Sequence, residues 1–207
     1  MSIATDFIPI CPEILYFGTP VAVLSSLNPD GGTNLAALSS FWALGDRLVL
    51  GLGVFGQTAA NLRRHPGCVL NLPSPRQWPQ VERLGHTTGC ARLTEYHRTA
   101  GIAYANDKFA ASGFTALPAE CVKPDRVAEC PVHIEARVSA VHPATDAAPF
   151  IYVETRKLRV HAQRDILNAR ATRIDIDAWS PLFYLFRHNY GKGAHLGASF
   201  RARDEWC

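Results

Sequence analysis

A closed β-barrel with a few helical additions is the fold class that the sequence predicts, and two observations predict it. Most apolar runs are short, rich in β-branched residues and separated by turn residues at the spacing of hairpins. Few segments carry apolar residues at helical spacing, so we expect helices only as additions to the barrel. The sequence has no internal repeat and no linker-like stretch, and we therefore expect one domain over residues 1–207.

The clearest hairpin lies near the N-terminus. Pro20–Leu27 has the pattern of a strand and Thr33–Ala43 that of its return strand, with the turn sequence Asn-Pro-Asp-Gly-Gly between them. A third strand is expected over Arg47–Phe55, where two glycines on one face would allow a large molecule to approach closely. A short helix over Thr58–His65 and a strand over Cys68–Leu72 follow.

The second half of the chain is less regular. Gln77–Ala105 is a mixed segment that turns helical. Pro131–Val141 and Ile151–His161 alternate between apolar and polar residues, which is typical of half-buried strands. The tail Trp179–Tyr190 is too aromatic to be left in water, so we expect it in a core or at an interface.

Composition and charge exclude several classes of protein. The chain is 47% hydrophobic and 19% charged, which is ordinary for a globular protein with a real core. Its net charge of +3 is dispersed, which argues against nucleic-acid binding, and no apolar run approaches the ~18 residues of a membrane helix. The N-terminus has no signal-peptide pattern, and the six cysteines lack both a C-x-x-C pair and zinc-ligand spacing. We therefore expect a cytoplasmic protein with free thiols, with no metal site and no nucleic-acid or membrane partner.

One motif matches a dinucleotide-binding sequence pattern but lacks the strand–turn–helix context that this pattern requires. The stretch from Gly51 to Gly56 has the dinucleotide-binding pattern G-x-G-x-x-G. The apolar run continues through these glycines, which places them within a strand, and the acidic residue expected about 20 positions later is absent. The preceding hairpin also belongs to an antiparallel meander, so we reject a Rossmann site.

Small polar residues at the ends of elements are the remaining candidates for chemistry. Ser39 and Ser40 stand in the second predicted strand, where their hydroxyls could address the edge of a ring. Gln57 and Thr58 stand at the start of the short helix, with Asn61 one turn later. The N–H groups of a helix N-terminus suit a phosphate monoester. The alternative is that Thr58 is simply the N-cap of the helix.

Four stretches carry motifs in a defined order, namely Pro20–Phe41, Gln57–Asn61 with Val69–Leu72, Lys108–Phe114 with Ala128–Glu135, and Tyr190 with its neighbouring glycines. In this order they resemble the flavin reductase-like family of FMN-binding split barrels, which includes flavoredoxin-type proteins. The resemblance covers nearly the whole chain. It implies a mainly β fold, an FMN-binding split β-barrel with a few flanking helices.

The resemblance also implies roles around the flavin ring. Ser39, Ser40 and Phe41 would hold the isoalloxazine. Asn71 would reach the flavin edge, or else be a buried amide bonded to backbone. His161 would lie over the flavin, in one reading from the partner subunit, or else stand at a strand end in solvent.

Other roles concern the phosphate and the end of the chain. Gln57 and Thr58 would bind the phosphate, supported by Asn61. Many relatives place a basic residue beside this threonine, and since Gln57 has no charge, Lys108 is the residue that would compensate. Tyr190 would be a ligand or a packing residue.

The implied function is flavin-dependent redox chemistry in a homodimer with the flavin near the interface. FMN is what the resemblance to the family implies, and the short turn at Gln57 and Thr58 also suits one phosphate better than two, with FAD as the alternative. NAD(P)H would supply hydride without an acid–base side chain, so no catalytic residue is named. A monooxygenase could accept the reduced flavin.

One departure from the family keeps other functions open. The "GDH" motif that is associated with NADH use is missing from the corresponding stretch, Ala144–Pro149. The alternatives are a flavoredoxin-like electron-transfer protein or other non-catalytic flavin-binding protein, a reductase of another small organic molecule, and a structural dimer that binds no cofactor.

Overall fold

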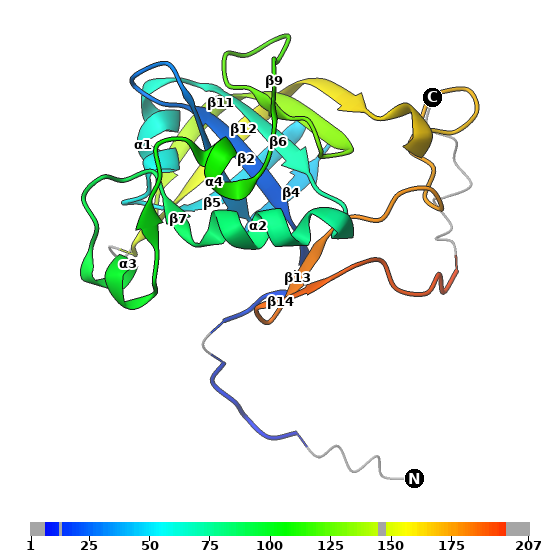
Figure 1. Cartoon of the computed structure of the whole chain (residues 1–207). Coiled ribbons are helices and arrows are strands. Elements are labelled where there is room, and N and C mark those ends of the chain that lie inside the picture. The colour runs from blue at the N-terminus through cyan, green and yellow to red at the C-terminus, as the bar shows by residue number, and fades with distance from the viewer. Residues whose placement is uncertain (1–6, 13, 145–147, 198–207) are drawn as a thin grey trace.

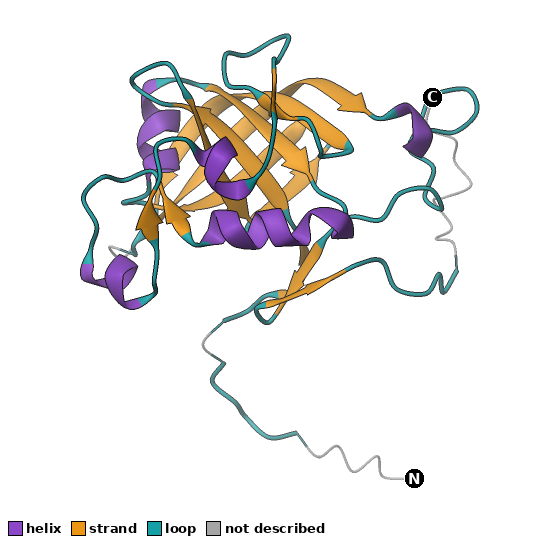
Figure 2. Cartoon of the chain, in the orientation of Figure 1, coloured by secondary structure: helices purple, strands orange, loops and turns teal. Residues whose placement is uncertain are grey.

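The structure is a computed structural model that describes residues 7–12, 14–144 and 148–197. Its centre is a seven-stranded antiparallel sheet in the spatial order β3-β2-β6-β11-β12-β5-β4, which curls around an apolar core (Figures 1 and 2). In chain order these strands are β2 Ala22–Leu27, β3 Thr33–Leu38, β4 Phe41–Leu44, β5 Arg47–Gly53, β6 Gly67–Leu72, β11 Val132–Pro143 and β12 Phe150–Ala162. The expected mainly β split barrel with a few flanking helices is confirmed.

The barrel is split between two strands that are neighbours in sequence. Among the residues that the structure describes, β3 pairs only with β2 and β4 only with β5, so the two form the opposite edges of the sheet. Ser39 and Ser40 lie between them and belong to neither strand. Two expectations are therefore wrong: the hydrogen-bond ladder does not close, and Thr33–Ala43 is not one strand. The break at the two serines lets the chain leave one edge and begin the other.

The predicted hairpin forms as expected from its turn residues. β2 and β3 pair from Leu27 and Thr33 to Ala22 and Leu38. Gly31 takes the left-handed conformation with φ of 89°, and the Asp30 carboxylate accepts the N–H of Gly32 at 2.9 Å. These are the roles in which glycine and aspartate favour turns.

β2 is buried on both faces because the barrel core lies on one side and helices lie on the other. Ala22 and Leu24 belong to the cluster inside the barrel, whereas Val21 and Val23 belong to a second cluster that also contains Val81. Helices α2 (Trp78–Gly85) and α4 (Lys108–Ser112) cross this outer face, as Figure 1 shows. A strand covered on both sides has an apolar run without alternation, as seen here.

The remaining elements are short. They comprise the helices α1 Gln57–Arg64 and α3 Glu95–Thr99, the 3₁₀ turns η1 Pro75–Gln77 and η2 Arg164–Ile166, and the strands β1 Phe17–Pro20, β7 Thr87–Thr88, β8 Ala103–Tyr104, β9 Ala116–Leu117, β10 Arg126–Val127, β13 Phe183–Leu185 and β14 His188–Tyr190. The aromatic tail enters the fold through β13, which pairs with β1. Within the described ranges, no helix combines the length and apolarity needed to cross a membrane. The single domain over 1–207 and the cytoplasmic location stay predictions.

Candidate functional site

The split in the barrel opens into a cavity of about 350 Å³. One wall is the chain segment 36–40, which ends in Ser39 and Ser40. The floor is formed by β5 at Gly51 and Gly53, and the far end by Thr58 at the start of α1. Three hydroxyls that the sequence singled out therefore line one cavity, although their positions along the chain differ by nearly 20 residues.

Strand parity decides which side chains face this cavity. The N–H of Gly51 donates to the carbonyl of Ser40 at 2.7 Å, so these two residues lie side by side on the outer surface of the sheet. Phe41 pairs with Leu50 and packs on the core cluster inside the barrel. Adjacent strand residues point to opposite faces. The expectation that Phe41 holds the flavin ring is therefore not supported, because its side chain faces the core.

The glycines of the rejected dinucleotide-binding pattern form the floor of the cavity. Gly51 pairs with Tyr152 and Gly53 pairs with Phe150, so both lie within the β5–β12 ladder, as we expected. A Cβ at Gly51 would lie 3.2 Å from the Cβ of Ser40, and one at Gly53 would project into open space. Hydrogen at these positions therefore leaves room for a flat group against the backbone.

Helix α1 presents an uncapped N-terminus to the same cavity. Its N-cap is Gly56, which has no side chain to accept the first N–H groups, so the alternative that Thr58 is the N-cap is wrong. Thr58 is the second helical residue and is buried, and its hydroxyl accepts the Nδ2–H of Asn34 at 3.0 Å. An acceptor bond from Asn34 leaves the hydroxyl hydrogen of Thr58 able to point at a ligand.

Side-chain amides hold this helix start in place. Gln57 donates from Nε2 to Oδ1 of Asn61 at 2.9 Å. Asn61 is buried and donates from Nδ2 to Oδ1 of Asn28 at 2.9 Å. Asn61 thus connects the helix to the end of the β2 strand, which is a supporting position behind the first turn.

Lys108 is a buried cation without a counter-charge. It is the first residue of α4 and only 3% exposed, and within the described part of the chain its ammonium has neither an ion pair nor a hydrogen bond. Burial lowers its pKa to about 8, although the neighbouring Cys90 opposes this shift. Cys90 donates to the carbonyl of Phe55, just before α1, at 3.4 Å. Lys108 is not among the residues that line the cavity, and its link to the helix start runs through Cys90. A buried lysine without a partner among the described residues is suited to an anionic ligand.

A known family accounts for this arrangement. A model of flavin reductase-like domains matches residues 14–190. The chain belongs to the flavin reductase-like family. The resemblance read from the four sequence stretches is thereby confirmed.

Individual relatives agree with this membership. The uncharacterized protein YdfE of Bacillus subtilis is 40% identical over 196 residues, which cover 95% of this chain and 94% of YdfE. The solved flavoredoxin of Desulfovibrio vulgaris superposes with a TM-score of 0.77 at 18% identity, over 96% of this chain and all of the other. The solved structure of nitrilotriacetate monooxygenase component B from Bacillus cereus superposes with a TM-score of 0.74 at 15% identity, over 94% of this chain and 100% of the other. The last two likenesses show the fold shared with the family.

Asn71 does not line the cavity of this flavin reductase-like protein. It is fully buried in β6, where its amide donates to the carbonyl of Val23 at 2.7 Å and to the Ser25 hydroxyl at 3.0 Å. Its Oδ1 accepts the N–H of Val127 at 2.9 Å. The alternative of a buried amide bonded to backbone describes it, and no group is left for a flavin edge.

His161 and Tyr190 also lie elsewhere in the chain. His161 stands at the end of β12 opposite to Phe150, and its Nε2 is 2.7 Å from Oε1 of the fully buried Glu135. It is therefore neither over the cavity of its own chain nor free in solvent. Tyr190 is half exposed and lines a separate hollow beside Trp78.

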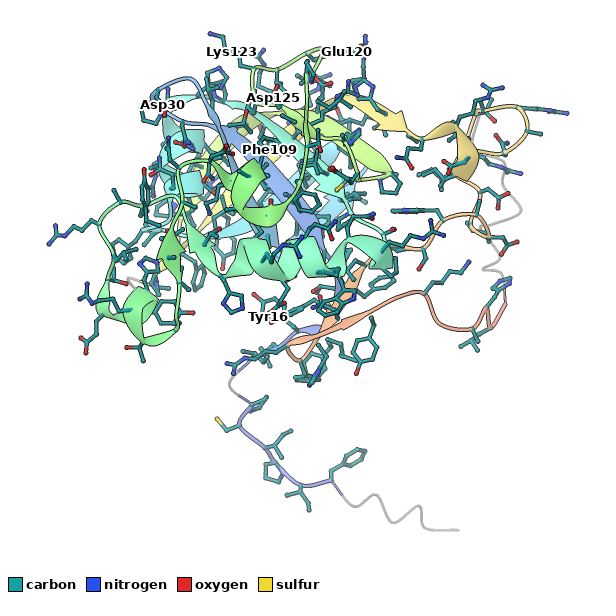
Figure 3. The ribbon with its side chains drawn as sticks, viewed as in Figure 1. Tyr16, Asp30, Phe109, Glu120, Lys123 and Asp125 are labelled. Atoms are coloured by element: carbon teal, nitrogen blue, oxygen red, sulfur yellow. The ribbon has the colours of Figure 1, made fainter. Side chains whose placement is uncertain are left out.

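Tyr16 is a site residue that sequence reasoning missed. Its hydroxyl lies 2.8 Å from the hydroxyl of Ser40, and its ring meets that of Tyr184 edge-on with centroids 5.5 Å apart. Figure 3 shows Tyr16 beneath α2, where the N-terminal segment reaches the barrel. No local pattern marks this residue, because it is brought to the serines by the pairing of β1 with β13.

Proposed function

We propose that the protein binds FMN in the cavity at the split of the barrel and acts as an NAD(P)H-dependent flavin reductase. The observation that carries the proposal is the cavity itself, which combines the hydroxyls of Ser39, Ser40 and Thr58 with a floor of backbone at Gly51 and Gly53. A flat ring fits against bare backbone, and hydroxyls suit its polar edge.

The phosphate would lie at the start of α1. The N–H groups of the first helical turn have no partner within the helix, and Gly56 provides no capping side chain. Thr58 would add a hydroxyl, and Lys108 would supply the positive charge that Gln57 lacks.

The proposed reaction requires little acid–base chemistry from the side chains of the protein. Bound FMN would supply the two-electron chemistry, accepting hydride from a nicotinamide donor. Ser39 and Ser40 would orient the ring, with Ser40 itself held by Tyr16. None of these residues has to transfer a proton for hydride transfer to occur, and their task is orientation.

The final electron acceptor is proposed from the relatives. One similar structure is a component of nitrilotriacetate monooxygenase, which favours delivery of reduced flavin to a monooxygenase. A flavoredoxin-like electron carrier is the second candidate, favoured by the missing "GDH" motif at 144–149. Residues 145–147 of that stretch lie outside the described part of the chain.

We further propose that a second copy of the chain covers the outer face of β4, β5 and β12. Four large side chains on this face are 39–73% exposed, namely Trp42, Leu44, Phe150 and Tyr152. Phe150 and Tyr152 pair directly with Gly53 and Gly51, so a partner on this face would border the flavin cavity. The strand register places Arg47, Glu154 and Arg156 on the same face, beside these apolar side chains. Exposed apolar side chains bordered by polar ones are typical of a protein interface.

The dimer is tested by light scattering after gel filtration. Trp42→Glu should give a monomer, because a carboxylate would be buried in the interface. Trp78→Glu is the matched control, since Trp78 is 50% exposed against 56% for Trp42 but lies on helix α2. A monomeric wild-type protein, or a dimer that survives Trp42→Glu, would contradict the proposal.

The visible absorbance spectrum tests the function directly. The purified protein, loaded with FMN, should show a flavin spectrum that bleaches when NADH or NADPH is added without oxygen. Retained flavin that does not bleach would replace the reductase with the electron carrier. A protein that stays colourless and does not take up FMN would overturn the flavin site itself.

A further inference from the structure

A second cavity, of about 420 Å³, adjoins the proposed flavin cavity. The two share the wall made by Tyr16, Ala37, Leu38 and Ser39, so a molecule in one would lie beside a molecule in the other. The second cavity extends from this wall to the end of α2 and to helix α3. The proposed FMN site uses only the shared wall.

The walls of the second cavity suit an aromatic ring. Three tyrosines line it: Tyr16 and Tyr184 at its inner end, and Tyr96 of α3, which is 70% exposed. Val81 and Ile102 add apolar surface between them. Aromatic side chains bind flat aromatic molecules by stacked or edge-on contacts, and tyrosine hydroxyls remain available to polar substituents.

The charges around the second cavity disfavour an anion. Glu82 lines it, and its carboxylate is 3.8 Å from His86, in a pair whose two side chains are exposed. Gly85 and His86 mark the end of α2, so the negative end of the helix dipole faces the same space. Among the described lining residues there is no lysine and no arginine. Arg187 lines the neighbouring hollow together with Glu82, and its charge reaches Tyr184 of the second cavity, where it opposes the rise that burial gives the pKa of that hydroxyl.

We propose that this second cavity binds a reactant of the flavin other than the NAD(P)H donor, and that this reactant is a planar aromatic molecule with no phosphate or carboxylate, either uncharged or cationic. The proposal rests on the proposed function for the identity of the neighbour, FMN. It adds the chemical class of the second ligand, which the contrast between the two cavities indicates. The first cavity offers an uncapped helix start and three hydroxyls, and the second offers a carboxylate and a helix end.

Three ligands of one shape and different charge test the proposal. They are 4-nitrobenzylamine, 4-nitrobenzyl alcohol and 4-nitrobenzoate, which at neutral pH are a cation, a neutral molecule and an anion. Their binding to the full-length protein, with and without FMN, is measured by equilibrium dialysis. We expect the amine and the alcohol to bind about tenfold or more tightly than the benzoate.

Two variants test whether this order of ligand affinities arises in the second cavity. Glu82→Gln should narrow the gap between amine and benzoate by roughly threefold or more, because the carboxylate no longer repels the anion. Glu129→Gln is the control, since it removes a carboxylate that lines a different hollow, although Glu129 is partly buried and Glu82 is exposed. Tyr96→Ala should weaken all three ligands by a similar factor, roughly threefold to tenfold, because it removes a ring and no charge.

The outcomes separate this proposal from the proposed function. If FMN binds but the benzoate binds as well as the amine, or none of the three ligands binds, the proposal for the second cavity is wrong while the flavin site stands. Equal effects of Glu82→Gln and Glu129→Gln would also overturn it. If FMN does not bind while the charge order and the Glu82→Gln effect hold, the second cavity is supported and the flavin reductase function fails.

Discussion

The hydroxyl oxygens of Tyr16 and Ser40 lie 2.8 Å apart, across the point where the barrel is split. Ser40 belongs to the break between the two edge strands, and Tyr16 lies just before β1, outside the barrel sheet. The hydrogen bond therefore attaches a peripheral segment to the wall that the two cavities share. It also fixes the hydroxyl of Ser40, which would otherwise rotate freely on an irregular stretch of chain.

Tyr16→Phe should weaken FMN binding severalfold and leave the fold intact. The variant keeps the ring against Tyr184 and removes only the hydroxyl that orients Ser40. Titration of FMN by flavin fluorescence measures the effect. Tyr104→Phe is the control, because Tyr104 is exposed and its hydroxyl makes only a 3.5 Å contact with Asn106. Equal FMN affinities for both variants and the wild type would argue that Tyr16 has no part in the site.

Thr58→Ala should reduce FMN affinity by about tenfold without unfolding the protein, because a hydroxyl donor to the phosphate is lost. Thr58→Ser retains that hydroxyl and should bind FMN nearly as well as the wild type. Thr155→Ala is the matched control for a lost buried hydroxyl, since Thr155 is fully buried and bonds to the carbonyl of Leu48. If flavin retention in Thr58→Ala equals that of the wild type, the phosphate site is misplaced.

FMN binding should weaken as the pH rises above about 8, the value to which burial lowers the pKa of Lys108. Below this pH the free protein holds a charged ammonium ready for the phosphate. Above it the amine is neutral, so phosphate binding requires uptake of a proton and the affinity falls. Calorimetric titrations with FMN between pH 7 and 10 measure this dependence.

Lys108→Met tests the assignment of that pH dependence. The variant should bind FMN at least about tenfold more weakly at pH 7 and lose the decline above pH 8. Riboflavin, which has no phosphate, should bind the variant and the wild type alike. Lys123→Met, at an exposed lysine labelled in Figure 3, should behave as the wild type. A decline with pH that persists in Lys108→Met would assign it to another group.

Glu135→Gln should lower the free energy of unfolding by about 2 kcal/mol near neutral pH. Glu135 is fully buried and accepts the backbone N–H groups of Glu120 and Cys121 as well as the contact from His161. Urea denaturation followed by tryptophan fluorescence measures the difference. Glu154→Gln, on a surface pair with His142 at 2.9 Å, should change stability far less.

The carboxylate of Glu135 should also make the free energy of unfolding depend on pH in the acidic range. Burial alone would raise the pKa of Glu135, but the backbone N–H groups and His161 outweigh burial and hold it below its ordinary value of 4.5. A lowered folded-state pKa contributes stability above the unfolded value, and this contribution is lost as the pH falls through the folded value. The gap between wild type and Glu135→Gln should therefore shrink below about pH 4. A gap that stays constant down to pH 3 would contradict the lowered pKa.

Features that depend on neighbours along the chain were predictable from the sequence. The turn between β2 and β3 follows from Asp30 and Gly31, whose local conformations need no tertiary contact. The placement of Gly51 and Gly53 inside a strand followed from the apolar run that continues through them. The order of short motifs was enough to identify the family, since that order is a property of the chain and not of its packing.

Features that depend on the register between distant strands were decided only by the tertiary structure. Ser40 and Phe41 are adjacent, yet pairing with β5 sends one to the cavity and the other to the core. His161 bonds to Glu135 because β12 lies beside β11 in this register, and no local pattern contains that information. The sequence determined the helices, the strands and the family because each of these depends on patterns of residues that are close together in the chain. The structure determined the split, the cavities and the side chains that meet there, because these arise from contacts between residues far apart in the chain.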